Sequence, residues 1–109
     1  MTYKQIADMV ATVGVPYAYH HFPENTGQDT PFICFFYPRS NDFVADDTNY
    51  QRINQLTVEL YTDNKDFPLE HQVEDALNSA GLVWSKEDFY IDEERMYLTS
   101  YITEVIINE

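Results

Sequence analysis

Residues 51–81, QRINQLTVELYTDNKDFPLEHQVEDALNSAG, decide the fold, because they contain the chain's clearest strand, its clearest helix and the turn between them. Leu56, Val58 and Leu60 alternate with Thr, Glu and Tyr residues, and this period of two places the three aliphatic side chains on one face of a strand. A second apolar set follows the spacing of one α-helical face and comprises Leu69, Val73, Ala76, Leu77 and Ala80. We expect the helix to cover the aliphatic strand face.

The ends of this helix carry their own signals. Pro68 suits a first helical position, where no backbone N–H is needed, and either Asp66 or Phe67 is the N-cap. Glu70 lies in the first turn, where a negative charge complements the helix dipole, and Gly81 ends the helix. This strand, turn and helix contain no catalytic motif.

Length, charge and cysteine use limit the class of protein. A chain of 109 residues predicts a single domain over residues 1–109 with one two-layer core. Six Lys and Arg against nineteen Asp and Glu give a net charge of −13, which repels nucleic acid and anionic membranes. No apolar run approaches the roughly 20 residues of a membrane span. Cys34, the single cysteine, lies in an apolar run and is expected to be buried, so we expect no disulfide and a reducing, cytosolic origin.

The first part of the chain predicts one more helix and two strands. Thr2 and Gln5 form a capping-box pattern before an amphipathic segment that Gly14 ends. Residues 17–22 predict a short strand. Residues 32–37 are apolar at every position, so we expect an interior strand that is covered on both faces.

Residues 40–50 predict a hairpin that projects from the body of the domain. They are polar and acidic, except for the apolar pair Phe43 and Val44 near the tip. An apolar pair on a projecting hairpin is costly unless another surface covers it. Both residues are therefore predicted to contact another protein.

The last part of the chain predicts further strands. Residues 82–84 and 89–91 predict strand on either side of a charged kink at residues 86–88, and a final strand runs from about 95 to 107. The element order is α-β-β-β-α-β-β, which predicts an α+β domain with a mostly antiparallel sheet and two helices packed on one face. The second face of the sheet, which is rich in aromatic side chains, is expected to contact a partner. Tyr61, Tyr97 and Tyr101 are candidate interface residues, with half-exposed strand positions, where Tyr is also common, as the alternative.

Several other residues are of types that carry chemistry. His20, His21 and Glu24 are candidate metal ligands, but adjacent strand residues point to opposite faces, so the two imidazoles are poorly placed to share an ion. The acidic runs at residues 46–47 and 92–94 lack the spacing of a calcium loop. The chain also has no phosphate loop and no nucleophile elbow. We expect no metal, no cofactor and no enzymatic activity.

Three segments together resemble the small tail-completion proteins of phages, namely the tail terminators of long non-contractile tails. They are TVELYTDNKDFPLEHQVEDALNSAG, LVWSKEDFYIDEERMY and YLTSYITEVII, which cover residues 57–107, about half of the chain. The shared pattern is a strand that ends in Tyr, a short turn with Lys, an acidic helix and a Tyr-rich hairpin. Residues 1–56 match this family only in the order of their elements.

The resemblance implies a structural protein of the virion, found at the head–tail interface after assembly in the host cytoplasm. It implies a homo-oligomeric ring, commonly a hexamer, that stops growth of the tail tube at its head-proximal end. Its partners would be the tail tube protein and the head completion or connector protein. An acidic ring would let DNA pass without binding it, since like charges repel.

Two alternatives stay open. One is another protein of the head-to-tail joint. The other is an acidic DNA mimic that inhibits a nucleic-acid-binding enzyme, for which the charge of −13 is the main support. A mimic needs carboxylates ordered along one face, whereas here they concentrate in turns and on the outer side of the second helix.

Overall fold

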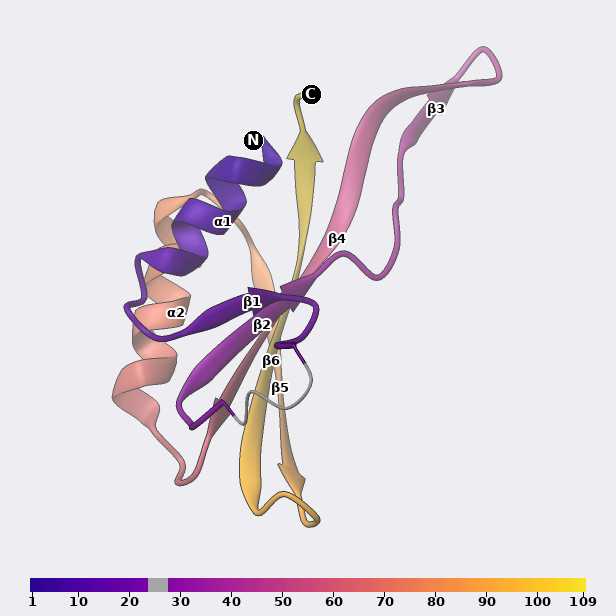
Figure 1. Ribbon diagram of the computed structural model, residues 1–109. Helices are drawn as coiled ribbons and strands as arrows, with labels where there is room; N and C mark the ends of the chain where they lie inside the picture. The colour runs from indigo at the N-terminus through magenta and orange to yellow at the C-terminus, as the bar shows by residue number, and fades with distance from the viewer. Residues whose placement is uncertain (24–27) are drawn as a thin grey trace.

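The computed structural model describes residues 1–23 and 28–109 and shows a sheet with two helices on one face (Figure 1). The elements are α1 (Tyr3–Ala11), β1 (Tyr17–Tyr19), β2 (Phe32–Phe36), β3 (Phe43–Ala45), β4 (Thr48–Thr62), α2 (Phe67–Ser79), β5 (Trp84–Ile91) and β6 (Met96–Ile107). The strand order is β1-β2-β4-β6-β5, with β3 paired to β4 outside this path. Among the described strands, β1 and β2 pair in parallel and the other pairs are antiparallel. The expected α+β class is confirmed, with β3 as an additional short strand.

β4 is the centre of the sheet. It has 15 residues, and it pairs with β2 and β3 along one edge and with β6 along the other. Leu60 lies opposite Ile33 of β2, and Val58 lies opposite Tyr101 of β6. These side chains are all buried on the face that the helices cover, as the period of two in β4 predicts.

The apolar stripe of α2 packs on that face. The carboxylate of Asp66 accepts a hydrogen bond from the backbone N–H of Leu69 at 3.0 Å, which identifies Asp66 as the N-cap. Val73 and Leu77 are buried in the same core as the aliphatic residues of β4. The predicted packing of this helix on the strand is confirmed.

α1 completes the helical layer. The predicted capping box is present: Thr2 Oγ1 accepts from the backbone N–H of Gln5 at 3.1 Å, and Gln5 Oε1 accepts from the N–H of Thr2 at 2.9 Å. Gly14 and Gly81 have positive φ angles of 89° and 76°, which a residue with a side chain rarely adopts, soon after α1 and α2 end. The described residues include no helix with both the length and the apolar character of a membrane span.

Two local predictions were wrong. The strand expected over residues 17–22 ends at Tyr19, because His20 has a φ of 68° and leaves the extended conformation. The kink expected at residues 86–88 is absent, and β5 is continuous from Trp84 to Ile91. The charges there do not break the strand because alternate residues, Lys86 and Asp88, find ionic partners on one face.

A two-stranded arm projects beyond the sheet where the sequence predicted a hairpin (Figure 1). We define the arm as residues 41–51, which include β3 and the first residues of β4. The pairing of β4 with β6 begins only at Arg52 and Ile107, so the arm has no third strand beside it. Asp46 and Asp47 form its tip, with φ angles of 52° and 60°. The arm supplies no residue to the buried core.

Truncation of the strand–helix core should destabilise the domain. Leu60→Ala and Leu77→Ala should each lower the free energy of unfolding by about 2–5 kcal/mol, because each removes a fully buried aliphatic side chain. Urea melts measure this loss. Ile106→Ala is the matched control, since Ile106 is 52% exposed, and it should change the free energy by less than about 0.5 kcal/mol. An equally small loss at Leu60 or Leu77 would mean that α2 does not pack on β4.

Candidate functional site

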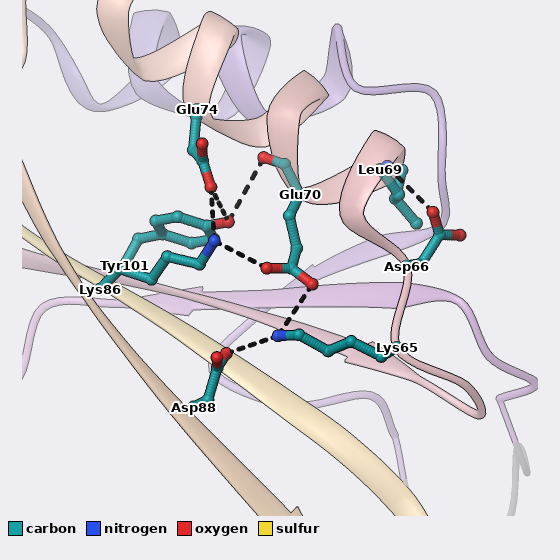
Figure 2. A network of polar contacts seen from close by, with 8 residues as sticks. All are labelled: Lys65, Asp66, Leu69, Glu70, Glu74, Lys86, Asp88 and Tyr101. Carbon is teal, nitrogen blue, oxygen red and sulfur yellow. Dashed lines mark hydrogen bonds and ion pairs between the residues drawn. The ribbon is translucent and has the colours of Figure 1, made fainter.

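A buried ionic network joins α2 to the sheet (Figure 2). The carboxylate of Glu70 is almost fully buried and lies between two ammonium groups, 2.9 Å from Lys65 Nζ and 2.7 Å from Lys86 Nζ. Lys65 Nζ also lies 2.8 Å from Asp88, and Lys86 Nζ lies 2.9 Å from Glu74. The network therefore bridges the turn before α2, the first turns of α2 and strand β5.

Tyr101 of β6 also belongs to the network. Its hydroxyl donates to Glu74 Oε2 at 2.8 Å and lies 3.3 Å from the backbone carbonyl of Glu70. Burial raises the pKa of the Tyr101 phenol, and the hydrogen bond to Glu74 raises it further, so the hydroxyl remains a donor. Each member of the network thus has an ionic or hydrogen-bonding partner, which is the condition under which buried charges are tolerated; Glu70 Oε1 meets Lys86 as an ion pair without hydrogen-bond geometry.

Four charged groups around Glu70 have pKa values shifted in the direction that favours their charged forms. Burial alone would raise the pKa of Glu74, but hydrogen bonds from Lys86 and Tyr101 outweigh it and lower the pKa below 4.5. A hydrogen bond from Lys65 lowers the pKa of Asp88 below 3.8. Burial alone would lower the pKa values of Lys65 and Lys86, yet their carboxylate partners raise both.

Sequence reasoning missed this network. Glu70 was expected only to complement the helix dipole, and residues 86–88 were expected to form a kink. The signal was present in β5, where Lys86 and Asp88 are two residues apart and therefore share a strand face. Two opposite charges on the covered face of a sheet require partners from the covering helix.

The arm exposes apolar side chains that the domain itself does not cover. Phe43, Val44 and Tyr50 are 57%, 58% and 75% exposed. The base of the arm is held by Asp42, whose carboxylate accepts from the backbone N–H of Ile53 at 3.0 Å and from Asn49 Nδ2 at 3.1 Å. The arm is thus attached firmly at its base and presents an apolar surface near its tip.

The sheet face opposite the helices carries a second apolar surface, which we call the apolar band. The band has two rows on this face of the sheet. The strand registers align the first row, which comprises Phe32, Tyr61, Leu98 and Phe89. Met96 and Ile91 form the next row. The neighbouring row is largely polar, with Glu59 and Ser100 at its centre, so this face is apolar at one end rather than throughout.

The three tyrosines that were predicted as interface residues lie in different places. Tyr61 belongs to the apolar band, where its ring stacks on Phe32 with centroids 4.8 Å apart. Tyr97 is half-buried and makes an edge contact with Tyr90 at 5.0 Å. Tyr101 is fully buried beneath α2, so the prediction that it contacts another protein was wrong. Period-two alternation placed Tyr101 on one face of β6 but did not show which face α2 covers.

The remaining candidates for chemistry are His20, His21, Glu24 and Cys34. His20 and His21 are exposed with Nδ1 atoms 3.1 Å apart, so the expectation that they point to opposite faces was wrong, because His20 lies outside the strand. Glu24 lies outside the described residues. Elsewhere along the described chain, no group of three or more His, Cys, Asp or Glu side chains is arranged to hold a metal ion. Cys34 is buried, and burial, followed by the charge of Glu59, raises the pKa of its thiol.

Comparisons with known proteins extend the description of the fold. No family model matches the chain, and no curated protein matches it. A solved structure with a similar fold is a chain from the "Virion of native gene transfer agent (GTA) particle". The similarity covers 98% of this chain and 91% of that chain, with a TM-score of 0.66 and 14% sequence identity. It shows that the two chains share a fold over nearly their whole length.

Acid should destabilise the domain through Glu74 and Asp88. Because the folded state lowers both pKa values, their contribution to stability is complete above about pH 4.5 and is lost as the pH falls through the folded pKa values. Glu74→Gln should be less stable than the parent at pH 7, and the difference should shrink towards pH 3. Urea melts across this range provide the measurement. Asp75→Asn, at an exposed site on the same helix, is the control, and a constant difference for Glu74→Gln would contradict the proposed role of the network.

The arm should exchange amide hydrogens quickly in an isolated subunit. It has two strands and no core residue, so its opening costs little free energy. Deuterium exchange followed by mass spectrometry should show fast exchange at Phe43 and Val44 in monomer and slow exchange in an assembly. Amides of β6 are the internal control, because they lie between two strands. Strong protection at Phe43 and Val44 in verified monomer would contradict this prediction.

Proposed function

We propose that this chain is a structural protein of a phage or phage-like virion and acts as a tail terminator. In this role it forms a ring, hexameric in our proposal, at the head-proximal end of the tail tube. The ring stops tube growth and joins the tail to the head connector. The observation that carries the proposal is the fold that the chain shares, over 98% of its length, with a component of a gene transfer agent virion.

The exposed apolar surfaces support a role in assembly. Phe43 and Val44 are more than half exposed on the arm, and the apolar band adds Phe89, which is 49% exposed, beside five half-buried side chains on the sheet face opposite the helices. Exposed apolar surface of this kind usually marks a protein–protein contact. The two surfaces lie at opposite ends of the molecule (Figure 1), so one subunit can contact a neighbour and a partner of another kind at the same time.

The charges support passage of DNA rather than DNA binding. The net charge is −13, and the ammonium groups of Lys4, Lys65 and Lys86 are already paired with carboxylates of the same chain. Few cations therefore remain to neutralise phosphates. A ring of such subunits repels the DNA backbone and lets it pass.

The arrangement of carboxylates argues against a DNA mimic. The acidic turns at residues 46–47 and 92–94 lie at opposite ends of the molecule (Figure 1), and Glu70 and Glu74 are tied to lysines. A mimic presents its carboxylates as one ordered row. Another protein of the head-to-tail joint would use the same surfaces as a terminator, and a measurement of tube length separates these two roles.

Assembly should strengthen as salt rises. Six subunits carry six times −13, or −78, so salt screens the repulsion that opposes a ring while apolar contacts remain. Light scattering from low to high sodium chloride should show a particle mass that rises to a fixed multiple of the subunit mass. Alternatively, rings should form only when tail tubes are added. A DNA mimic would instead lose affinity for its basic target as salt rises.

The arm variants test the same proposal. Phe43→Ser combined with Val44→Ser should weaken ring formation and tube capping with little change in the melting temperature. Val83→Ser is the matched control, because Val83 is 89% exposed outside the arm. A protein that stays monomeric at every salt concentration, and that neither binds tail tubes nor limits their length, would disprove the terminator role.

A further inference from the structure

The turn that follows β1 brings two histidine side chains together. His20 has a φ of 68°, in the left-handed region, so the alternation of the strand stops there. In an extended chain the rings of His20 and His21 would point to opposite faces, whereas here their Nδ1 atoms lie 3.1 Å apart. The ring centroids are 5.2 Å apart, and the ring planes meet at 88°. Two nitrogen atoms of a kind that binds metal ions therefore face each other.

The sheet holds both histidines in this arrangement. The backbone N–H of His20 donates to the carbonyl of Phe35 at 2.7 Å. The backbone N–H of His21 donates to the carbonyl of Tyr19 at 2.8 Å. The His20 ring also packs against the ring of Phe36, with centroids 5.5 Å apart. Phe35 and Phe36 belong to β2, which lies between β1 and β4, so the pair is attached to an interior strand.

Burial does not explain why the two rings meet. Both residues are exposed, so water can satisfy their nitrogen atoms, and no buried polar group requires a partner here. The left-handed backbone at His20 is less favourable than an extended one for a residue with a Cβ. A ligand that both nitrogen atoms bind would supply a reason for the arrangement.

The separation of the two nitrogen atoms suits one metal ion. Bonds from imidazole nitrogen to Zn²⁺ are about 2.0–2.1 Å long. Two such bonds from atoms 3.1 Å apart meet at the ion at an angle of about 95–100°. This angle lies between the right angle of square or octahedral shells and the wider angle of a tetrahedral shell. Cu²⁺, Ni²⁺ and Zn²⁺ adopt these geometries.

We infer that His20 and His21 form a two-ligand site for a divalent transition metal ion. Both Nδ1 atoms bind the ion, and each ring is neutral with its proton on Nε2. Imidazole is a ligand for Cu²⁺, Ni²⁺ and Zn²⁺, whereas Mg²⁺ and Ca²⁺ prefer oxygen ligands. The remaining coordination positions are open to water or to a ligand from another molecule. The inference does not depend on the proposed role in a tail.

Nickel binding to the untagged protein tests the site. In a buffer that does not coordinate metal ions, calorimetry should show one Ni²⁺ ion bound per chain. His20→Asn and His21→Ala should each lower the affinity at least about tenfold, because loss of either nitrogen removes the chelate. The double variant should lose little more than either single variant, since the two ligands act together. His71→Ala, at an exposed histidine on α2, is the matched control and should keep the parent affinity.

The choice of Asn at position 20 keeps the fold. Asn tolerates the left-handed conformation, and both histidines are exposed, so each variant should keep the melting temperature of the parent. A loss of Ni²⁺ affinity in these variants would then report on the ligands and not on unfolding.

NMR spectra locate the bound ion. Ni²⁺ is paramagnetic, so small additions should first broaden the amide signals of the residues around the pair, including Tyr19 and Phe36. Excess Zn²⁺ should compete with Ni²⁺ and remove the broadening, whereas the same concentration of Mg²⁺ should not.

Three outcomes would overturn the inference. Equal affinities of the parent and His20→Asn would show that the pair does not hold the ion. Two bound ions per chain, one lost with each histidine, would show independent sites instead of a chelate. Broadening centred on the acidic turns at residues 46–47 or 92–94, or displacement of Ni²⁺ by Mg²⁺, would show that the ion follows the net charge of −13.

Discussion

The position of α2 depends on one buried carboxylate. Glu70 lies on the first turn of the helix and is held between Lys65, which precedes the helix, and Lys86 on the sheet. Removal of either ammonium would leave a buried charge only partly paired, which is far more costly than the loss of a surface ion pair. Glu70 thus ties the start of α2 to the preceding turn and to β5, beside the stripe through which Val73 and Leu77 pack in the core.

The sequence was informative where the pattern was local. Alternation in residues 56–60 and the helical spacing of residues 69–80 both predict elements whose apolar sides meet in the structure. The capping box at Thr2 and the helix start at Asp66 are also local signals, since each depends on atoms three residues apart. Such features need no knowledge of the rest of the fold.

The errors came from partners that are distant in sequence. β6 is apolar on both faces, so alternation alone does not show that Tyr101 lies under α2 rather than on the open face. Likewise, the charges of Lys86 and Asp88 predicted a break in β5. Their ionic partners come from α2 and from the turn before it, which are distant in sequence.

The length of the arm determines how far its tip lies from the sheet. A strand rises about 3.3 Å per residue, so two residues added to each of its strands would extend it by about 7 Å without touching the core. A single added residue per strand would instead turn every later side chain to the opposite face. The reach of the arm can therefore change only in steps of two residues. A step of two residues at the base of the arm would move Phe43 and Val44 farther from the sheet and keep each side chain on its present face.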